Sequence, residues 1–158
     1  MFLLNGVKGP LNVYYPESIG PYVQWCGTCQ PGEIEADAIL KALIAVSLEI
    51  KRDPPNCGIT TVNVVLLDRD SLELSLANNP EEMGSLTRLV ILPLHRWRQR
   101  GLFPSHMTTA VVEEFVHAWY YIDDELLVER KVAECLRHLG PSVRVEDVYN
   151  PHWKPDDN

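Results

Sequence analysis

The segment from Glu33 to Arg52 constrains the fold more than any other part of the chain, because it is long and contains neither glycine nor proline. Its apolar side chains recur with the spacing of a helix that is buried over much of its surface. Asp53-Pro54-Pro55 follows, and prolines cannot continue a helix. We therefore predict one long, mostly buried helix from Glu33 to about Arg52. Its apolar positions are Ile34, Ala38, Leu40, Leu43, Ile44, Val46, Leu48 and Ile50.

Residues 1–32 have the opposite character, because prolines and glycines interrupt them too often for long regular elements. These residues are Pro10, Pro16, Pro21, Pro31, Gly6, Gly9, Gly20, Gly27 and Gly32. We expect an irregular N-terminal segment here, with at most a short strand at Leu11–Tyr15.

Strand-forming stretches follow the long helix. Ile59–Leu67 is rich in β-branched residues and continuously apolar toward its end, as a central strand requires. Leu86–Leu92 predicts a further strand, which Pro93 halts. Ser71–Leu76 alternates apolar and polar residues, which indicates a strand but leaves a short helix open.

Two more helices are predicted in the C-terminal half. Thr108 or Thr109 can cap a helix that runs to about residue 121. Asp123 or Asp124 can cap the next helix, which runs to about residue 139 and is stopped by Gly140-Pro141. Helices and strands in this order predict an α+β fold in a single domain.

Length and composition agree with one domain, since 158 residues with 46% hydrophobic residues suffice for one sizeable core. We assign residues 33–140 to the domain, residues 1–32 to an irregular N-terminal segment and residues 141–158 to a C-terminal extension and tail. A formal charge of −8 argues against a general nucleic-acid or anionic-membrane surface, because both need a positive field. Arg96, Arg98 and Arg100 form a local basic cluster, which we interpret as a solvated strand end or loop.

The N-terminal apolar stretch is too short for a secretion signal, and no run approaches the roughly 18 apolar residues of a membrane span. We therefore expect a cytoplasmic protein. Its four cysteines do not predict a disulfide framework in such a chain.

Candidate chemistry centres on the run Glu113-Glu114-Phe115-Val116-His117. In the HExxH motif of zinc hydrolases, two histidines one turn apart hold zinc, and the glutamate beside the first activates water. Glu113 stands in place of the first histidine, and a carboxylate oxygen can also bind zinc. In a helix, Glu113 and His117 would form a chelating pair, with Glu114 as the general base.

This run and the order of elements over roughly residues 33–139 resemble the zincin metallopeptidases, particularly small gluzincin-like members. The resemblance implies a mixed sheet packed against one long helix, with the motif helix beneath the sheet. It also implies a third ligand on the next helix, where Glu129 matches the position, with Asp123 as the alternative ligand. The strand ending at Leu92 would be the edge that aligns an extended peptide.

The resemblance implies a peptidase in which Glu113, His117 and Glu129 bind a divalent metal ion, zinc before others, and act on a peptide or protein. The Glu113 substitution gives the metal two negative ligands, which makes a bound water less acidic and shifts preference toward manganese or iron. A zincin-like protein that binds a peptide or protein partner without hydrolysis is therefore the alternative within the same scaffold.

A different class of function is suggested by Trp25-Cys26-Gly27-Thr28-Cys29, which precedes the long helix. This run resembles the redox motif of thioredoxin-like proteins, where the helix dipole lowers the pKa of the first cysteine. The alternatives are a thiol oxidoreductase using Cys26 and Cys29, a structural metal site or disulfide at these cysteines, and two cysteines in a turn.

Overall fold

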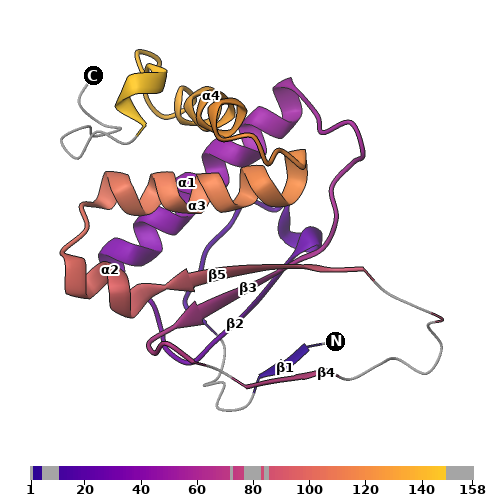
Figure 1. The fold of residues 1–158 in the computed structure, drawn as a ribbon, viewed down its shortest axis with the longest axis vertical. Coiled ribbons are helices and arrows are strands. Elements are labelled where there is room, and N and C mark those ends of the chain that lie inside the picture. The colour runs from indigo at the N-terminus through magenta and orange to yellow at the C-terminus, as the bar shows by residue number, and fades with distance from the viewer. Residues whose placement is uncertain (1, 5–10, 72, 77–82, 84–85, 149–158) are drawn as a thin grey trace.

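The computed structural model describes residues 2–4, 11–71, 73–76, 83 and 86–148. They form a single domain that mixes helices with a small parallel sheet (Figure 1). The strands are β1 (Phe2–Leu4), β2 (Val23–Gly27), β3 (Val62–Leu67), β4 (Leu74–Leu76) and β5 (Arg88–Pro93). The helices are α1 (Glu33–Arg52), α2 (Leu94–Arg100), α3 (Pro104–Tyr120) and α4 (Glu125–Leu136), with short 3₁₀ turns at Gly20–Tyr22 and Val145–Asp147.

The described strands form two separate sheets. Strands β2, β3 and β5 are parallel, with β3 in the centre, and β1 pairs with β4 in antiparallel fashion. Every residue of β3 is buried, as a central parallel strand requires. The single mixed sheet implied by the zincin resemblance is therefore replaced, over the described residues, by a parallel sheet and a two-stranded antiparallel one.

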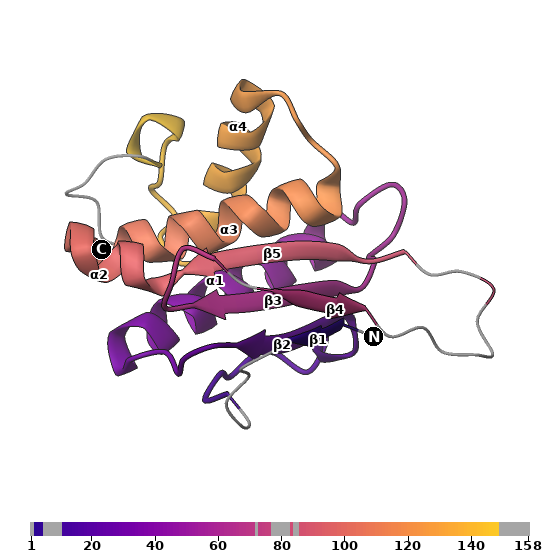
Figure 2. The same ribbon diagram turned by 60° about the horizontal axis from the view of Figure 1, so that its bottom comes forward.

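The long helices α1, α3 and α4 lie on one side of the parallel sheet (Figures 1 and 2). The main core lies between α1, α3 and the sheet, where Leu43, Leu66, Phe115 and Trp119 are completely or almost completely buried. Figure 2 shows α3 running alongside β5. The sheet thus supports the helix that carries the candidate motif.

Helix α1 spans Glu33–Arg52, which confirms the prediction for this segment. Its start is fixed because the Glu35 carboxylate accepts a hydrogen bond from the Gly32 N–H at 2.8 Å, which occupies an otherwise unpaired donor. Its end coincides with Asp53 and the prolines that follow.

The N-terminal segment is more regular than predicted. Val23–Gly27 is strand β2, paired in register with β3, whereas the predicted strand at Leu11–Tyr15 does not form. Only the pairing partner reveals β2, because the segment lacks a clear alternating pattern and lies among glycines and prolines. The sheet therefore begins within the segment assigned as irregular.

The basic cluster around Trp97 forms helix α2 and not a strand end or loop. Leu94 and Trp97, three residues apart, are both buried and anchor one face of this helix. Gly101 ends it in the left-handed conformation, with φ of 58°. Arg96, Arg98 and Arg100 are exposed, and the helix is too short and too charged to show a clear apolar period.

The two C-terminal helices form where predicted, with shifted ends. Helix α3 begins at Pro104, because proline suits the first helical position, and Thr108 and Thr109 lie inside it. Helix α4 begins after Asp124, whose side chain accepts a hydrogen bond from the Leu127 N–H at 3.0 Å. It ends at Leu136, three residues before the predicted end.

The first part of the C-terminal extension packs against the domain, since Val143 and Val148 are buried in the main core. Within the described residues, no helix is long and apolar enough to cross a membrane.

Candidate functional site

Helix α3 positions the candidate motif. Phe115, Val116 and Trp119 turn into the core, which fixes the rotation of the helix. Glu113 and His117 therefore lie together on a partly exposed side, with side-chain exposures of 26% and 31%. The predicted helical spacing of these two residues is thus present.

The imidazole of His117 is oriented by the backbone beyond α3. Its Nδ1 lies 2.7 Å from the Ile122 carbonyl oxygen, which can only accept a hydrogen bond, so Nδ1 is the donor. Nε2 lies 4.0 Å from the Glu113 carboxylate. A metal-binding histidine has this arrangement, with one ring nitrogen held by a backbone carbonyl and the other available as a ligand.

Glu114 follows Glu113 and reaches solvent. Desolvation raises the pKa of its carboxyl above the ordinary value, and the adjacent Glu113 charge raises it further. A raised pKa brings a carboxylate closer to the range in which it accepts protons efficiently near neutral pH. Glu114 is therefore a solvent-accessible carboxyl whose pKa lies above its ordinary value.

The predicted third ligands lie beyond α3. Asp123 is exposed in the connection to α4, and Glu129 is partly buried on α4 itself. Glu113, His117 and Glu129 do not appear among the described groups of three whose ligand atoms lie within 4.8 Å of one another. The structure therefore brings together the first pair of predicted ligands and not the complete set.

The group that meets this distance among the described residues is Glu49, Asp53 and Glu134, from α1, its C-cap and α4. These carboxylates could hold a metal ion. In the structure they surround the ammonium of Lys131, whose Nζ lies 2.7, 2.6 and 2.9 Å from Glu49, Asp53 and Glu134. Lys131 thus supplies the cation that these carboxylates require.

Glu49 is the centre of this acidic group. Its side chain is fully buried and accepts hydrogen bonds from Arg52, Lys131 and His138. Burial alone would raise its pKa, but these three partners outweigh burial and lower the pKa to about 2. Sequence reasoning missed this network. The sequence signal for this network is a pair of acidic residues four positions apart at the end of α1, Glu49 and Asp53. Such a pair is common on exposed helices and so does not single out a buried network.

The two predicted redox cysteines occupy different elements and pack against different groups of residues. Cys26 is on β2 and packs with Val65 and Leu67, whereas Cys29 follows the strand and packs against the main core. Both are free thiols, and neither lies at the first turn of α1. Burial raises the pKa of both thiols, and the Asp68 charge adds to the effect at Cys29. The features that make a cysteine reactive are the opposite ones.

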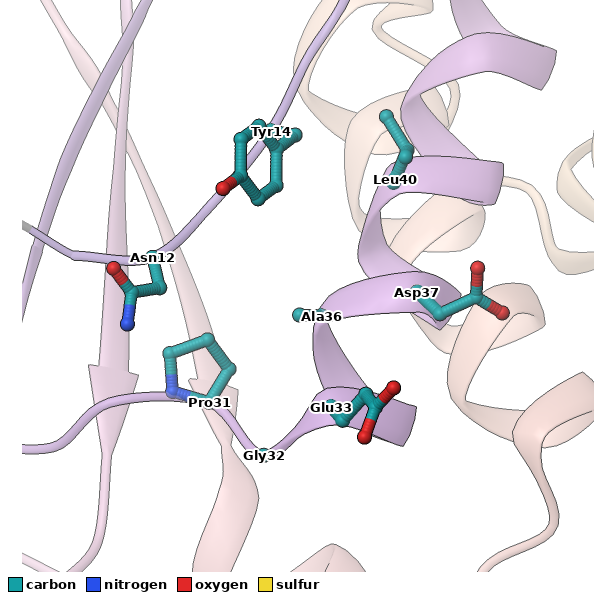
Figure 3. A pocket seen from close by; sticks show the side chains of 8 residues that line it. All are labelled: Asn12, Tyr14, Pro31, Gly32, Glu33, Ala36, Asp37 and Leu40. Carbon is teal, nitrogen blue, oxygen red and sulfur yellow. The ribbon is translucent and has the colours of Figure 1, made fainter.

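A pocket of about 530 Å³ lies at the start of α1, apart from the α3 motif. Figure 3 shows Tyr14, Asn12 and Pro31 facing the first turns of α1 across it. None of the predicted catalytic, metal-binding or cysteine residues lines this pocket.

Comparisons of the chain with models of protein families, with curated proteins and with solved structures give no match. The zincin resemblance therefore depends on the residues of α3 and on the order of the elements around it.

Proposed function

We propose that this protein is a zincin-type, metal-dependent hydrolase that acts on peptides, with its centre on α3. The observation that carries the proposal is the orientation of His117, whose Nδ1 donates to the Ile122 carbonyl while Nε2 faces Glu113. The position of α3 beside the strand β5 supports it, because an extended peptide can pair with an outer strand.

The first two proposed donors, Glu113 and His117, fit a divalent ion after a small adjustment. Two ligand atoms bound tetrahedrally to zinc at about 2.0–2.1 Å lie roughly 3.3 Å apart. His117 Nε2 and the Glu113 carboxylate are 4.0 Å apart, so a small side-chain rotation would bring both onto one ion. Glu129 is the proposed third ligand, from the helix that follows, and Asp123 remains its alternative.

Each residue has a separate task in the proposed reaction. A divalent ion bound by Glu113, His117 and Glu129 would supply Lewis acidity toward a peptide carbonyl. Glu114 accepts a proton from the attacking water, which its raised pKa favours. The Ile122 carbonyl holds His117 in the tautomer that keeps Nε2 unprotonated.

Metal content tests the proposal directly. We expect about one equivalent of zinc, manganese or iron in the untagged protein and none in His117→Ala, because the variant removes the only imidazole of the set. Elemental analysis after reconstitution measures this. Glu114→Gln should keep the metal and abolish chelator-sensitive peptide hydrolysis. Equal metal in wild type and His117→Ala would refute the proposed centre.

Lys131→Met is a matched control for the acidic group on α1 and α4. If metal were bound by Glu49, Asp53 and Glu134, removing the ammonium that they surround would increase metal content, and His117→Ala would leave it unchanged. The two sites thus give opposite responses to the two variants.

A non-hydrolytic, zincin-like binding protein is the second candidate function. The absence of Glu113, His117 and Glu129 from the close ligand groups among the described residues favours it, because catalytic zinc sites use three protein ligands. Peptide binding without turnover in metal-loaded protein would distinguish it. The thiol oxidoreductase alternative gains no support from the raised pKa of Cys26 and Cys29.

A further inference from the structure

Arg88 is a partly buried cation for which no ion pair is present among the described residues. Its guanidinium carbon lies 4.1 Å from the centre of the Tyr121 ring. Other arginines pair with carboxylates in a chain that carries 22 acidic and 14 basic residues. They are Arg52, Arg69, Arg96, Arg98 and Arg144. Among the described residues, Arg88 is therefore a partly desolvated guanidinium without a carboxylate partner.

The aromatic ring beneath Arg88 is itself held in place. Tyr121 ends α3 in the left-handed conformation, with φ of 56°, which non-glycine residues rarely adopt. Its hydroxyl lies 3.4 Å from the Thr60 hydroxyl, and the Trp119 indole N–H donates to the Thr60 carbonyl at 2.8 Å. Stacking occupies one face of the guanidinium and leaves its N–H edge available to an anion.

The position of Arg88 relates it to the candidate site on α3. Arg88 begins β5, two and four residues before the buried Val90 and Leu92. Alternate residues of a strand point to the same face, so the Arg88 side chain lies on the helix-covered side of the sheet. Figures 1 and 2 show α3 running opposite to β5, with the end of α3 beside the beginning of β5. Arg88 therefore lies at the C-terminal end of the motif helix.

Glu114 on α3 and Tyr121 at its C-cap lie on the same side of the helix, because residues separated by seven positions are nearly two turns apart. The rise along the axis between them is about 10 Å at 1.5 Å per residue. An extended peptide spans roughly 3.3 Å per residue, so this distance corresponds to about three residues.

We propose that Arg88, stacked on Tyr121, binds the terminal carboxylate of a peptide that pairs antiparallel with the outer edge of β5. Such a peptide places a bond about three residues from its C-terminus beside Glu114. This inference deepens the proposed hydrolase function and depends on it only for turnover, since carboxylate recognition by Arg88 needs no metal. The ligand class is a peptide chain end with a free α-carboxylate, recognised through charge-assisted hydrogen bonds.

Binding measured without turnover tests the inference. The probe is an N-terminally fluorescein-labelled hexapeptide of alanine and valine, as free acid and as amide, with Glu114→Gln protein and fluorescence anisotropy as the readout. We expect the acid to bind at least about tenfold more tightly than the amide, as loss of a hydrogen bond to a charged group implies. Arg88→Gln in the same background should remove this preference, and the control Arg100→Gln should keep it.

Two further variants separate the stacked geometry from charge alone. Tyr121→Phe retains the ring and should keep the preference for the acid, whereas Arg88→Lys retains only the charge and should weaken it. Equal binding of acid and amide, or an unchanged preference in Arg88→Gln with native circular dichroism, would overturn the inference. A third peptide, amidated and carrying an internal glutamate, should bind like the plain amide. If it bound like the acid, the ligand would be an acidic side chain and not a chain end.

The outcome is independent of the proposed hydrolase function. Acid-selective binding that requires Arg88 but no turnover by metal-loaded wild type would support the inference and reject the hydrolase. Hydrolysis that requires His117 but proceeds equally with the acid and the amide would support the hydrolase and overturn the inference.

Discussion

At the residue scale, position 113 would determine the metal chemistry of the site proposed on α3. Glu113 supplies a carboxylate where the HExxH motif has an imidazole, and its charge also raises the pKa of Glu114. A second carboxylate in the ligand set favours harder metal ions and makes a bound water less acidic. The second proposed ligand, His117, has its Nδ1 held by the Ile122 carbonyl oxygen, which leaves Nε2 for the proposed metal.

Glu113→His should therefore increase zinc affinity by about tenfold or more, because zinc prefers imidazole to carboxylate in such sites. It should also reduce the preference for manganese over zinc. Competition with a chromophoric chelator measures both affinities, with Glu113→Gln as the variant that loses a ligand. Unchanged zinc affinity in Glu113→His would mean that position 113 does not bind the metal.

At the element scale, Gly27 is explained by strand pairing and not by redox chemistry. A Cβ atom at this position would lie 2.6 Å from the Leu66 carbonyl oxygen and 2.9 Å from the Leu66 Cβ. Both atoms belong to the neighbouring strand β3, whose backbone cannot move without disturbing the sheet. The glycine between the two cysteines thus permits the close approach of β2 and β3.

Gly27→Ala should lower the free energy of unfolding by about 1–3 kcal/mol, which is the usual cost of overpacking. Urea denaturation measures the change. Gly32→Ala is the matched control, since its nearest contact would be an ordinary van der Waals distance of 3.7 Å to the Glu35 carboxylate. An equal loss in both variants would show that the strand contact is not the cause.

At the scale of the whole molecule, the buried charges join the helices on the covered side of the sheet. Glu49 comes from α1, Lys131 from α4, and the Lys131 ammonium also lies 4.5 Å from the centre of the Tyr120 ring on α3. Burial alone would lower the pKa of Lys131, and its bonds to Asp53, Glu49 and Glu134 raise it instead. Both Glu49 and Lys131 thus stay charged in the folded protein.

The free energy of unfolding should consequently fall at acidic pH. The pKa of Glu49 is about 2 in the folded protein and about 4.5 ordinarily, so the unfolded chain binds a proton more readily. Its contribution, at most about 3 kcal/mol for this shift, is complete above pH 4.5 and is lost as the pH falls toward 2.

Glu49→Gln should destabilise the protein by about 3 kcal/mol at pH 7, because it leaves Lys131 and Arg52 undercompensated. It should also flatten the fall in stability between pH 5 and pH 2. Urea unfolding at several pH values checks both effects. The pair of the exposed Asp37 and the partly exposed Lys41 on the same helix provides the control, and Asp37→Asn should change stability by less than about 0.5 kcal/mol. Similar losses in the two variants would contradict a special role for Glu49.

The sequence by itself determined the elements whose residues carry a strong local pattern. Helix α1 was predicted to its ends, because a helical apolar period and flanking breakers are properties of the segment alone. The existence of β3, β5, α3 and α4 followed in the same way, and so did the spacing of Glu113 and His117 on one helix.

Only the tertiary structure decided which distant residues meet. Strand β2 forms because it pairs with β3, and α2 forms because Leu94 and Trp97 are buried in the core. Neither element shows a clear hydrophobic period in the sequence. The ion network of Glu49 and Lys131 and the stacking of Arg88 on Tyr121 join residues far apart in the chain. Such contacts depend on how elements pack, and local propensity holds no information about that packing.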